Sequence, residues 1–261
     1  MSFMNKKIPN LIVTFIIFTI VFGIILWFLA PIGHNHARDI ARKMASKADL
    51  QNLELGLQNF YIDQGFYPAS TPRSKLQIAG PPDPAATPDQ GAHILFEALL
   101  GLDQKGCQKE HYYAFNDTGV PIDDAGNPTT RIEWYIEPNP EKFGSISQAC
   151  PPSDHFKSND NPVFLDAFDY ENRRPILYYR AHTRPDSPTE TYDYHDNAAI
   201  TTDTTDNGRQ KLHPNFDTHE KFHQYILNPN TNQSYKQDAF ILINAGPDHQ
   251  FGTDDDITNF K

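Results

Sequence analysis

The chain opens with a long apolar stretch. From Ile8 to Ile32 no side chain is charged, and nearly every residue is Ile, Leu, Val, Phe or Trp. As a helix this stretch would be about 37 Å long at roughly 1.5 Å per residue, and a bilayer core is about 30 Å thick. It lacks the polar stripe of a soluble buried helix. The pattern predicts a transmembrane helix over residues 8–32, after a cytoplasmic N-terminus over residues 1–7.

A cleaved secretory signal is the competing interpretation of this stretch. Lys6 and Lys7 form a short basic head, as in a signal peptide. However, the apolar run is longer than a usual signal core and ends without a small-x-small cleavage site, so a retained anchor is favoured. The two lysines favour a cytoplasmic N-terminus, whereas basic residues after the span favour the opposite orientation. These are Arg38, Arg42, Lys43 and Lys47.

After Pro31 the apolar residues recur at three- and four-residue steps, with charged and amide side chains between them. This period is typical of an amphipathic helix with one face against a core. The residues that follow it are Ile40, Met44, Leu50, Leu53, Leu57 and Phe60 or Tyr61. Gly65 is expected to end the helix, since glycine adopts the left-handed conformation that closes many helices. Residues 33–68 are therefore predicted to form an amphipathic helix and a turn.

Residues 69–261 show shorter elements separated by turns. A Pro-rich loop over residues 69–90 precedes a short helix whose apolar side includes Leu95 and Leu99. The clearest strand patterns cover residues 131–136, 175–180 and 239–244. Residues 184–237, rich in Thr, Asp, Asn and His, predict a long and partly irregular excursion. The expected fold class is α+β, with a transmembrane-plus-amphipathic helix packed on a small antiparallel sheet.

Composition and charge narrow the possible functions. The formal net charge of −11 argues against nucleic acid as a partner, because phosphate binding needs clustered Lys and Arg. The 18 Phe and 12 Tyr supply enough apolar surface for a core. Serine-hydrolase, Walker-type and dinucleotide-binding motifs are missing from the sequence. We therefore expect a globular domain that is not an enzyme.

The two cysteines, Cys107 and Cys150, both follow the apolar N-terminal stretch. If this part of the chain lies outside the cytoplasm, a single disulfide between them is expected, because disulfides persist in oxidising compartments. Two unpaired thiols are the alternative.

Three segments carry a further pattern. At the end of the predicted amphipathic helix, Asp63, Gly65, Tyr67 and Pro68 have the order Asp-x-Gly-x-Tyr-Pro. The other two segments are 165–179, with an aspartate followed by a Pro-x-x-Tyr-Tyr strand, and 240–257, with an apolar strand followed by an acidic loop. In this order behind an apolar helix, they resemble the major pseudopilin of type II secretion (general secretion pathway protein G) and related type IV pilin-like proteins.

The resemblance implies a pilin-like fold and a structural function in a type II secretion or type IV pilus-like apparatus. It implies a single pass through the bacterial inner membrane, with residues 69–261 as a periplasmic pilin-like domain. The expected partners are membrane lipid and other pseudopilin or apparatus subunits, contacted through the N-terminal helix.

The resemblance also implies calcium in the acidic C-terminal loop, because that loop holds a calcium ion in the family. Calcium takes about six to eight oxygen ligands, which carboxylates and backbone carbonyls can supply. The candidate ligands are Asp248, Asp254, Asp255 and Asp256. A solvated acidic turn is the alternative.

The start of the chain differs from the family pattern. Asn5–Leu11 has no glycine of the prepilin peptidase site, and the apolar run contains no glutamate. A membrane-anchored periplasmic binding or adhesion module on a pilin-derived fold therefore fits these residues as well as a filament subunit does.

A zinc-dependent peptidase is a third alternative. His219, Glu220 and His223 match the pattern His-Glu-x-x-His, in which two histidines bind zinc and the glutamate activates water. Pro214 lies just upstream and no glutamate follows His223 to act as a third ligand. Coincidence is therefore the favoured explanation of the match.

Overall fold

The computed structural model describes residues 10–72, 88–102, 104–108, 114–115, 121–122, 131–145, 161–168, 173–182, 191–201, 216 and 218–261. The chain divides into two compact units, Met1–Arg42 and Lys43–Lys261.

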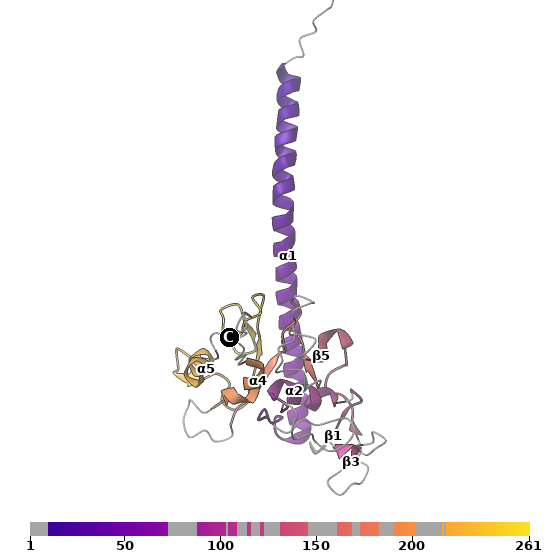
Figure 1. Ribbon diagram of the computed structural model, residues 1–261, viewed down its shortest axis with the longest axis vertical. Helices are drawn as coiled ribbons and strands as arrows, with labels where there is room; N and C mark the ends of the chain where they lie inside the picture. The colour runs from indigo at the N-terminus through magenta and orange to yellow at the C-terminus, as the bar shows by residue number, and fades with distance from the viewer. Residues whose placement is uncertain are drawn as a thin grey trace, which may run out of the picture. The chain divides into compact units, whose positions relative to one another are not determined.

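A single helix, α1 (Asn10–Gln64), covers both the predicted anchor and the predicted amphipathic helix (Figure 1). Of the predicted anchor, residues 8–32, the described side chains are those of Phe15 and residues 18–21. In the described part of the chain, no helix has both the length and the apolar character that crossing a membrane requires.

Helix α1 ends where the sequence predicts. Gly65 has φ 80°, and its N–H donates to the carbonyl of Tyr61 at 2.8 Å. This left-handed conformation is favourable for glycine and strained for other residues, so it closes the last helical turn.

The centre of Lys43–Lys261 is an antiparallel sheet in the order β11-β10-β7. Its strands are β7 (Leu177–Arg180), β10 (Phe240–Asn244) and β11 (Ile257–Thr258). Phe240 lies opposite Arg180, and Ile243 lies between Leu177 and Thr258. All five residues of β10 are buried, as expected for a continuous apolar run in a strand that is covered on both faces.

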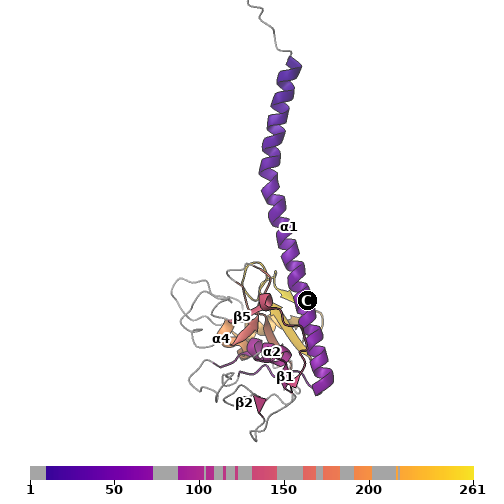
Figure 2. The ribbon, with the colours of Figure 1, turned by 90° about the vertical axis from the view of Figure 1, so that its right-hand side faces the viewer.

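Successive side chains of a strand point to opposite faces of the sheet, and each face has its own apolar core. One core joins Tyr178 and Leu242 to the C-terminal part of α1 and to α2 (Gly91–Leu100). Figure 2 shows α2 beside the C-terminal part of α1. The other core joins Tyr179 and Ile241 to α5 (His219–Ile226) and to the segment around Tyr192. Two helical layers therefore enclose the sheet.

The remaining elements are short. Four two-stranded pairs are described: β1 (Cys107–Gln108) with β4 (Arg131–Ile132), β2 (Ala114–Phe115) with β3 (Pro121–Ile122), β5 (Phe143–Ser145) with β6 (Pro162–Phe164), and β8 (Leu227–Asn228) with β9 (Gln233–Ser234). The described residues also form the short helical segments η1 (Pro140–Lys142), η3 (Tyr194–Asn197) and α4 (Ala198–Thr201).

The structure confirms a mixed fold of helices and small antiparallel sheets. The predicted helix around Leu95 and the two C-terminal strands are present as α2, β7 and β10. The predicted strand over residues 131–136 is wrong beyond Ile132, because the Tyr135 N–H donates to the carbonyl of Leu99 at 3.0 Å. The described parts of residues 184–237 contain η3, α4, α5 and the β8–β9 hairpin.

Candidate functional site

The C-terminal part of α1 has two apolar faces. Leu50, Leu53, Leu57 and Phe60 are buried against the sheet and α2. Met44, Leu55 and Ile62 are instead 68%, 57% and 76% exposed. At about 100° per residue, these three side chains lie within about 20° of one another and directly opposite Leu53. The prediction that Met44 lies on the buried face is therefore wrong, because Met44 lies on the side of the helix opposite Leu53. We refer to Met44, Leu55 and Ile62 as the apolar stripe.

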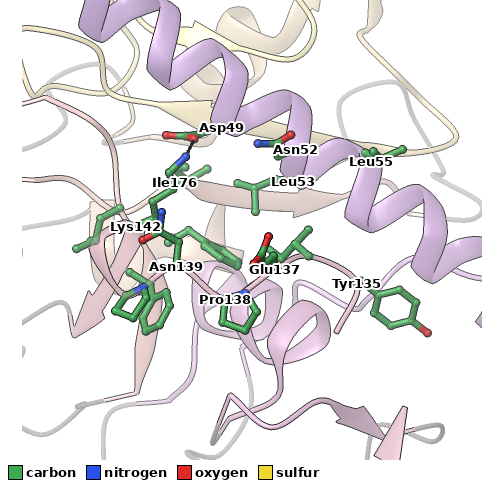
Figure 3. A pocket seen from close by; sticks show the side chains of 15 residues that line it. Asp49, Asn52, Leu53, Leu55, Tyr135, Glu137, Pro138, Asn139, Lys142 and Ile176 are labelled. Atoms are coloured by element: carbon green, nitrogen blue, oxygen red, sulfur yellow. Dashed lines mark hydrogen bonds and ion pairs between the residues drawn. The ribbon is translucent and has the colours of Figure 1, made fainter. Parts of the chain in front are cut away.

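A cleft of about 590 Å³ lies between α1 and the segment from Tyr135 to Phe143 (Figure 3). Its apolar lining includes Leu53, Phe164 and Ile176, which come from α1, β6 and the start of the central sheet. Leu55 of the apolar stripe lines the cleft as well, so the cleft opens beside the stripe.

Several contacts hold this segment to α1. The Tyr135 ring packs on Phe60 at 5.2 Å, and its hydroxyl accepts from Gln64 Nε2 at 3.2 Å. At one end Ile136 packs so closely on Gly56 that a Cβ at position 56 would lie 2.5 Å from Ile136 Cγ2. At the other end Lys142 Nζ forms an ion pair with Asp49 Oδ1. Asp49 and Gly56 are seven residues apart, or about 10 Å along the axis. Between the contacts at these two positions the cleft lies with α1 on one side and residues 137–140 of the segment on the other.

The segment from Tyr135 to Phe143 is stiff. Pro138 and Pro140 fix their own φ angles and restrict the residues before them. Asn139 Oδ1 accepts a hydrogen bond from the N–H of Glu141 at 3.0 Å, which starts the short helix η1. The cleft is therefore preformed.

In the predicted helix-end motif, Tyr67 and Pro68 attach the end of α1 to the sheet. The Tyr67 ring stacks on Tyr61 at 4.7 Å and meets Phe240 edge-on at 4.9 Å. The Tyr178 hydroxyl donates to the carbonyl of Pro68 at 2.6 Å. Asp63 is exposed on the last turn of the helix.

In the C-terminal loop between β10 and β11, carboxylates accept hydrogen bonds from N–H groups of the loop and from Tyr225 of α5. Asp255 Oδ2 accepts from the N–H of Asp248 at 3.1 Å. Asp256 Oδ2 accepts from the N–H of Gly252 at 2.8 Å and from the Tyr225 hydroxyl at 2.6 Å. Asp254 is exposed.

Burial makes this loop electrostatically unfavourable. Burial, with the neighbouring charges of Asp248 and Asp255, raises the pKa of Asp256 to about 7. Burial and the charge of Asp255 also raise the pKa of Asp248. Within the described parts of the chain, Asp256 Oδ1 is buried without a hydrogen-bond partner, which fits a site for a cation. Among the described residues, however, no three acidic, histidine or cysteine side chains are grouped as metal ligands.

Helix α5 carries the His-Glu-x-x-His pattern. The Thr218 hydroxyl caps it by accepting from the N–H of Lys221 at 3.3 Å. His219 and His223 are one turn apart, and burial together with the charge of His219 lowers the pKa of His223. Glu220 is exposed.

Cys107 is buried in β1, whereas Cys150 lies outside the described residues. The disulfide between them stays a prediction.

Sequence reasoning missed the cleft. Asn139, Lys142 and Glu137 line it, but no local pattern links them to α1, which is some 90 residues earlier in the chain. The two prolines of the segment were the one available signal, because they indicate a stiff irregular stretch. Comparisons of the chain with protein-family models, curated proteins and solved structures find no match.

Proposed function

We propose that this chain is a membrane-anchored, pilin-like structural subunit of a type II secretion or type IV pilus-like apparatus. In this proposal residues 8–32 anchor the chain in the bacterial inner membrane, and the domain that follows lies in the periplasm. Neighbouring subunits pack through α1.

The observation that carries the proposal is the apolar stripe. A helix on the surface of a lone globular domain normally places polar side chains opposite its buried face. The exposed Gln51 and Gln58 lie on this face of α1, but Met44, Leu55 and Ile62 also expose large apolar surfaces there. Exposed apolar surface of this kind is typical of an interaction face.

The helix-end motif supports the same proposal. In the resembling family, Asp-x-Gly-x-Tyr-Pro ends the long helix, and here Gly65 closes α1 while Tyr67 and Pro68 contact the sheet. The motif therefore ends the long helix and attaches that end to the small domain, as a pilin-like fold requires.

Self-association of the full chain tests the proposal. Leu55→Glu and Ile62→Glu should weaken self-association at least tenfold, because each places a charge in an apolar contact. Gln224→Glu adds the same charge to the exposed side of α5 and should leave association unchanged. The measurement is sedimentation or chemical crosslinking in detergent. A monomeric parent chain, or stripe variants that associate like the parent, would contradict the proposal.

A membrane-anchored binding or adhesion module is the second candidate, and the preformed cleft is the observation that favours it. The two candidates differ at the N-terminus. A permanently anchored module keeps its first residues, whereas a filament subunit of the resembling family is processed. N-terminal sequencing of the chain extracted from membranes separates them.

We also propose calcium in the C-terminal loop. Asp248, Asp255 and Asp256 would hold the ion together with backbone carbonyls, and the ion would neutralise charges that burial makes unfavourable. The full chain should then melt at a higher temperature in millimolar calcium than in chelator. Asp248→Ala should reduce this difference, and Asp63→Ala, an exposed aspartate on α1, should not. An unchanged melting temperature would refute the calcium site.

A further inference from the structure

Charges of opposite sign lie on the two sides of the apolar stripe. On one side Lys43 and Lys47 are exposed and one helical turn apart. At about 100° per residue they lie about 60–100° around α1 from Met44.

The other side of the stripe leads into the cleft. Asn52 and Asp49, which line it, lie about 80–140° from Met44 in the opposite direction around the helix. Across the cleft, the exposed Glu137 lines it, and Glu133 and Glu141 lie on the same segment outside the lining. Arg173 Nη1 donates to the carbonyl of Glu141. Residues 133–141 contain no lysine or arginine, and the basic group in the cleft lining, Lys142, is already paired with Asp49. Glu137 therefore places an exposed carboxylate beside the apolar part of the cleft.

We propose that the cleft of one copy receives the Lys43–Lys47 turn of α1 from a second copy. This inference rests on the proposed function and specifies how neighbouring subunits meet. Met44, 68% exposed, enters the apolar part of the cleft, and Lys43 and Lys47 face Glu137. Charge complementarity selects this occupant, because the same chain supplies a basic turn with an exposed apolar side chain at its centre.

The contact uses two different surfaces of the same chain, so it is heterologous. Each copy offers a basic turn to one neighbour and a cleft to another, and such contacts continue into an open helical array or a ring. The Lys43–Lys47 turn and the middle of the cleft are seven to eight residues apart along α1. Neighbouring copies are therefore displaced by about 10 Å along the helix axis.

Charge reversal in the full chain tests the contact. Lys47→Glu alone or Glu137→Lys alone should weaken self-association about two- to fivefold at low salt, as expected for exposed ion pairs. Mixing the two variants should restore association, since each unmatched surface then meets its complement on the other variant. Differently labelled chains followed by energy transfer measure this mixed association. Lys221→Glu and Glu220→Lys on α5 are matched controls and should behave like the parent chain.

A photo-crosslinking side chain at position 139 tests the register without changing any charge. The crosslinked partner peptide, identified by mass spectrometry, should contain residues 43–47. Crosslinks to other regions, or a mixture of variants that associates no better than either alone, would overturn this contact while leaving self-association through α1 intact. A parent chain that stays monomeric would overturn both proposals.

Discussion

At the scale of single residues, burial raises the pKa of several carboxyl groups in the domain toward neutral pH. Asp166, Asp196 and Asp256 each have a pKa raised to about 7, with burial as the largest cause. Asp196 illustrates the cost. One of its oxygens accepts a hydrogen bond from the Ser70 hydroxyl, while Oδ1 is buried without a donor among the described residues. A protonated carboxyl loses less in this environment than a carboxylate does.

These groups predict a stability that falls as pH rises. The pKa of Asp196 is about 7 in the folded chain and 3.8 as the ordinary value, so the folded chain binds more protons between these two pH values. The contribution of Asp196 is therefore complete below the unfolded pKa and is lost as pH rises through about 7. Urea unfolding of the full chain should give a lower free energy of unfolding at about pH 8 than at about pH 5.

The variant Asp196→Asn isolates this contribution, because an amide imitates the neutral carboxyl. It should reduce the decrease in stability between these two pH values, by about 1.4 kcal/mol for each unit of pKa shift removed. Asp63→Asn, at an exposed position, should not reduce it. If the stability of the parent and of Asp196→Asn depends on pH in the same way, the raised pKa of Asp196 is refuted.

Gly56 is a second position where one atom matters. An added Cβ would lie 2.5 Å from Ile136 Cγ2, so Gly56→Ala should destabilise the domain by about 1–2 kcal/mol although alanine favours helices. Ile136→Ala removes the clashing atom. In the Ile136→Ala background, Gly56→Ala should be neutral or stabilising, as measured by a double-mutant cycle of urea unfolding. Additive effects of the two changes would show that these residues do not touch.

At the scale of elements, local patterns predict what local forces decide. The period of Leu50, Leu53 and Leu57 and the glycine at position 65 predict the C-terminal part of α1 and its end. The continuous apolar run of β10 predicts a strand that is buried on both faces. The segment after Ile132 alternates like a strand, but Tyr135 bonds to α2 instead. Its conformation depends on a distant partner, which the sequence pattern does not reveal.

The cleft escaped sequence analysis for the same reason. It exists because Lys142 pairs with Asp49 and Ile136 packs on Gly56. Both contacts join residues some 80 to 90 positions apart, and periodicity along the chain carries no information about such pairs. The acidic loop was visible as a cluster of aspartates, but its internal hydrogen bonds were not.

Two leucines on α1 should separate folding from association. Leu57 is 0% exposed and Leu55 is 57% exposed. Leu57→Ala should lower the free energy of unfolding by about 2–5 kcal/mol, because it leaves a cavity in the core. Leu55→Ala should change it by less than about 0.5 kcal/mol and should instead weaken self-association. The opposite order in either measurement would mean that the two faces of α1 have been interchanged.

At the scale of the whole molecule, Lys43–Lys261 is held together by contacts between distant parts of the chain. Lys236 forms an ion pair with Glu54 of α1, and Asn197 Nδ2 donates to the carbonyl of Tyr178 at 2.8 Å. The core cluster on the α1 side combines α1 and α2 with strands β7 and β10, which lie far later in the chain. A covalent link would add to this long-range network, and the two cysteines are the candidates.

The last prediction concerns that link. A disulfide between Cys107 and Cys150 would close a loop of more than 40 residues, and chain entropy gives such a bridge about 4 kcal/mol of stabilisation. It would also require an oxidising compartment, as the proposed periplasmic location provides. Thiol labelling of the denatured, unreduced full chain should find no free thiol, and labelling after reduction should find two. Reduction should also lower the melting temperature of the parent, but not that of Cys150→Ser, which has no bridge to lose. Two labelled thiols before reduction would refute the bridge and weaken the argument for an oxidising compartment.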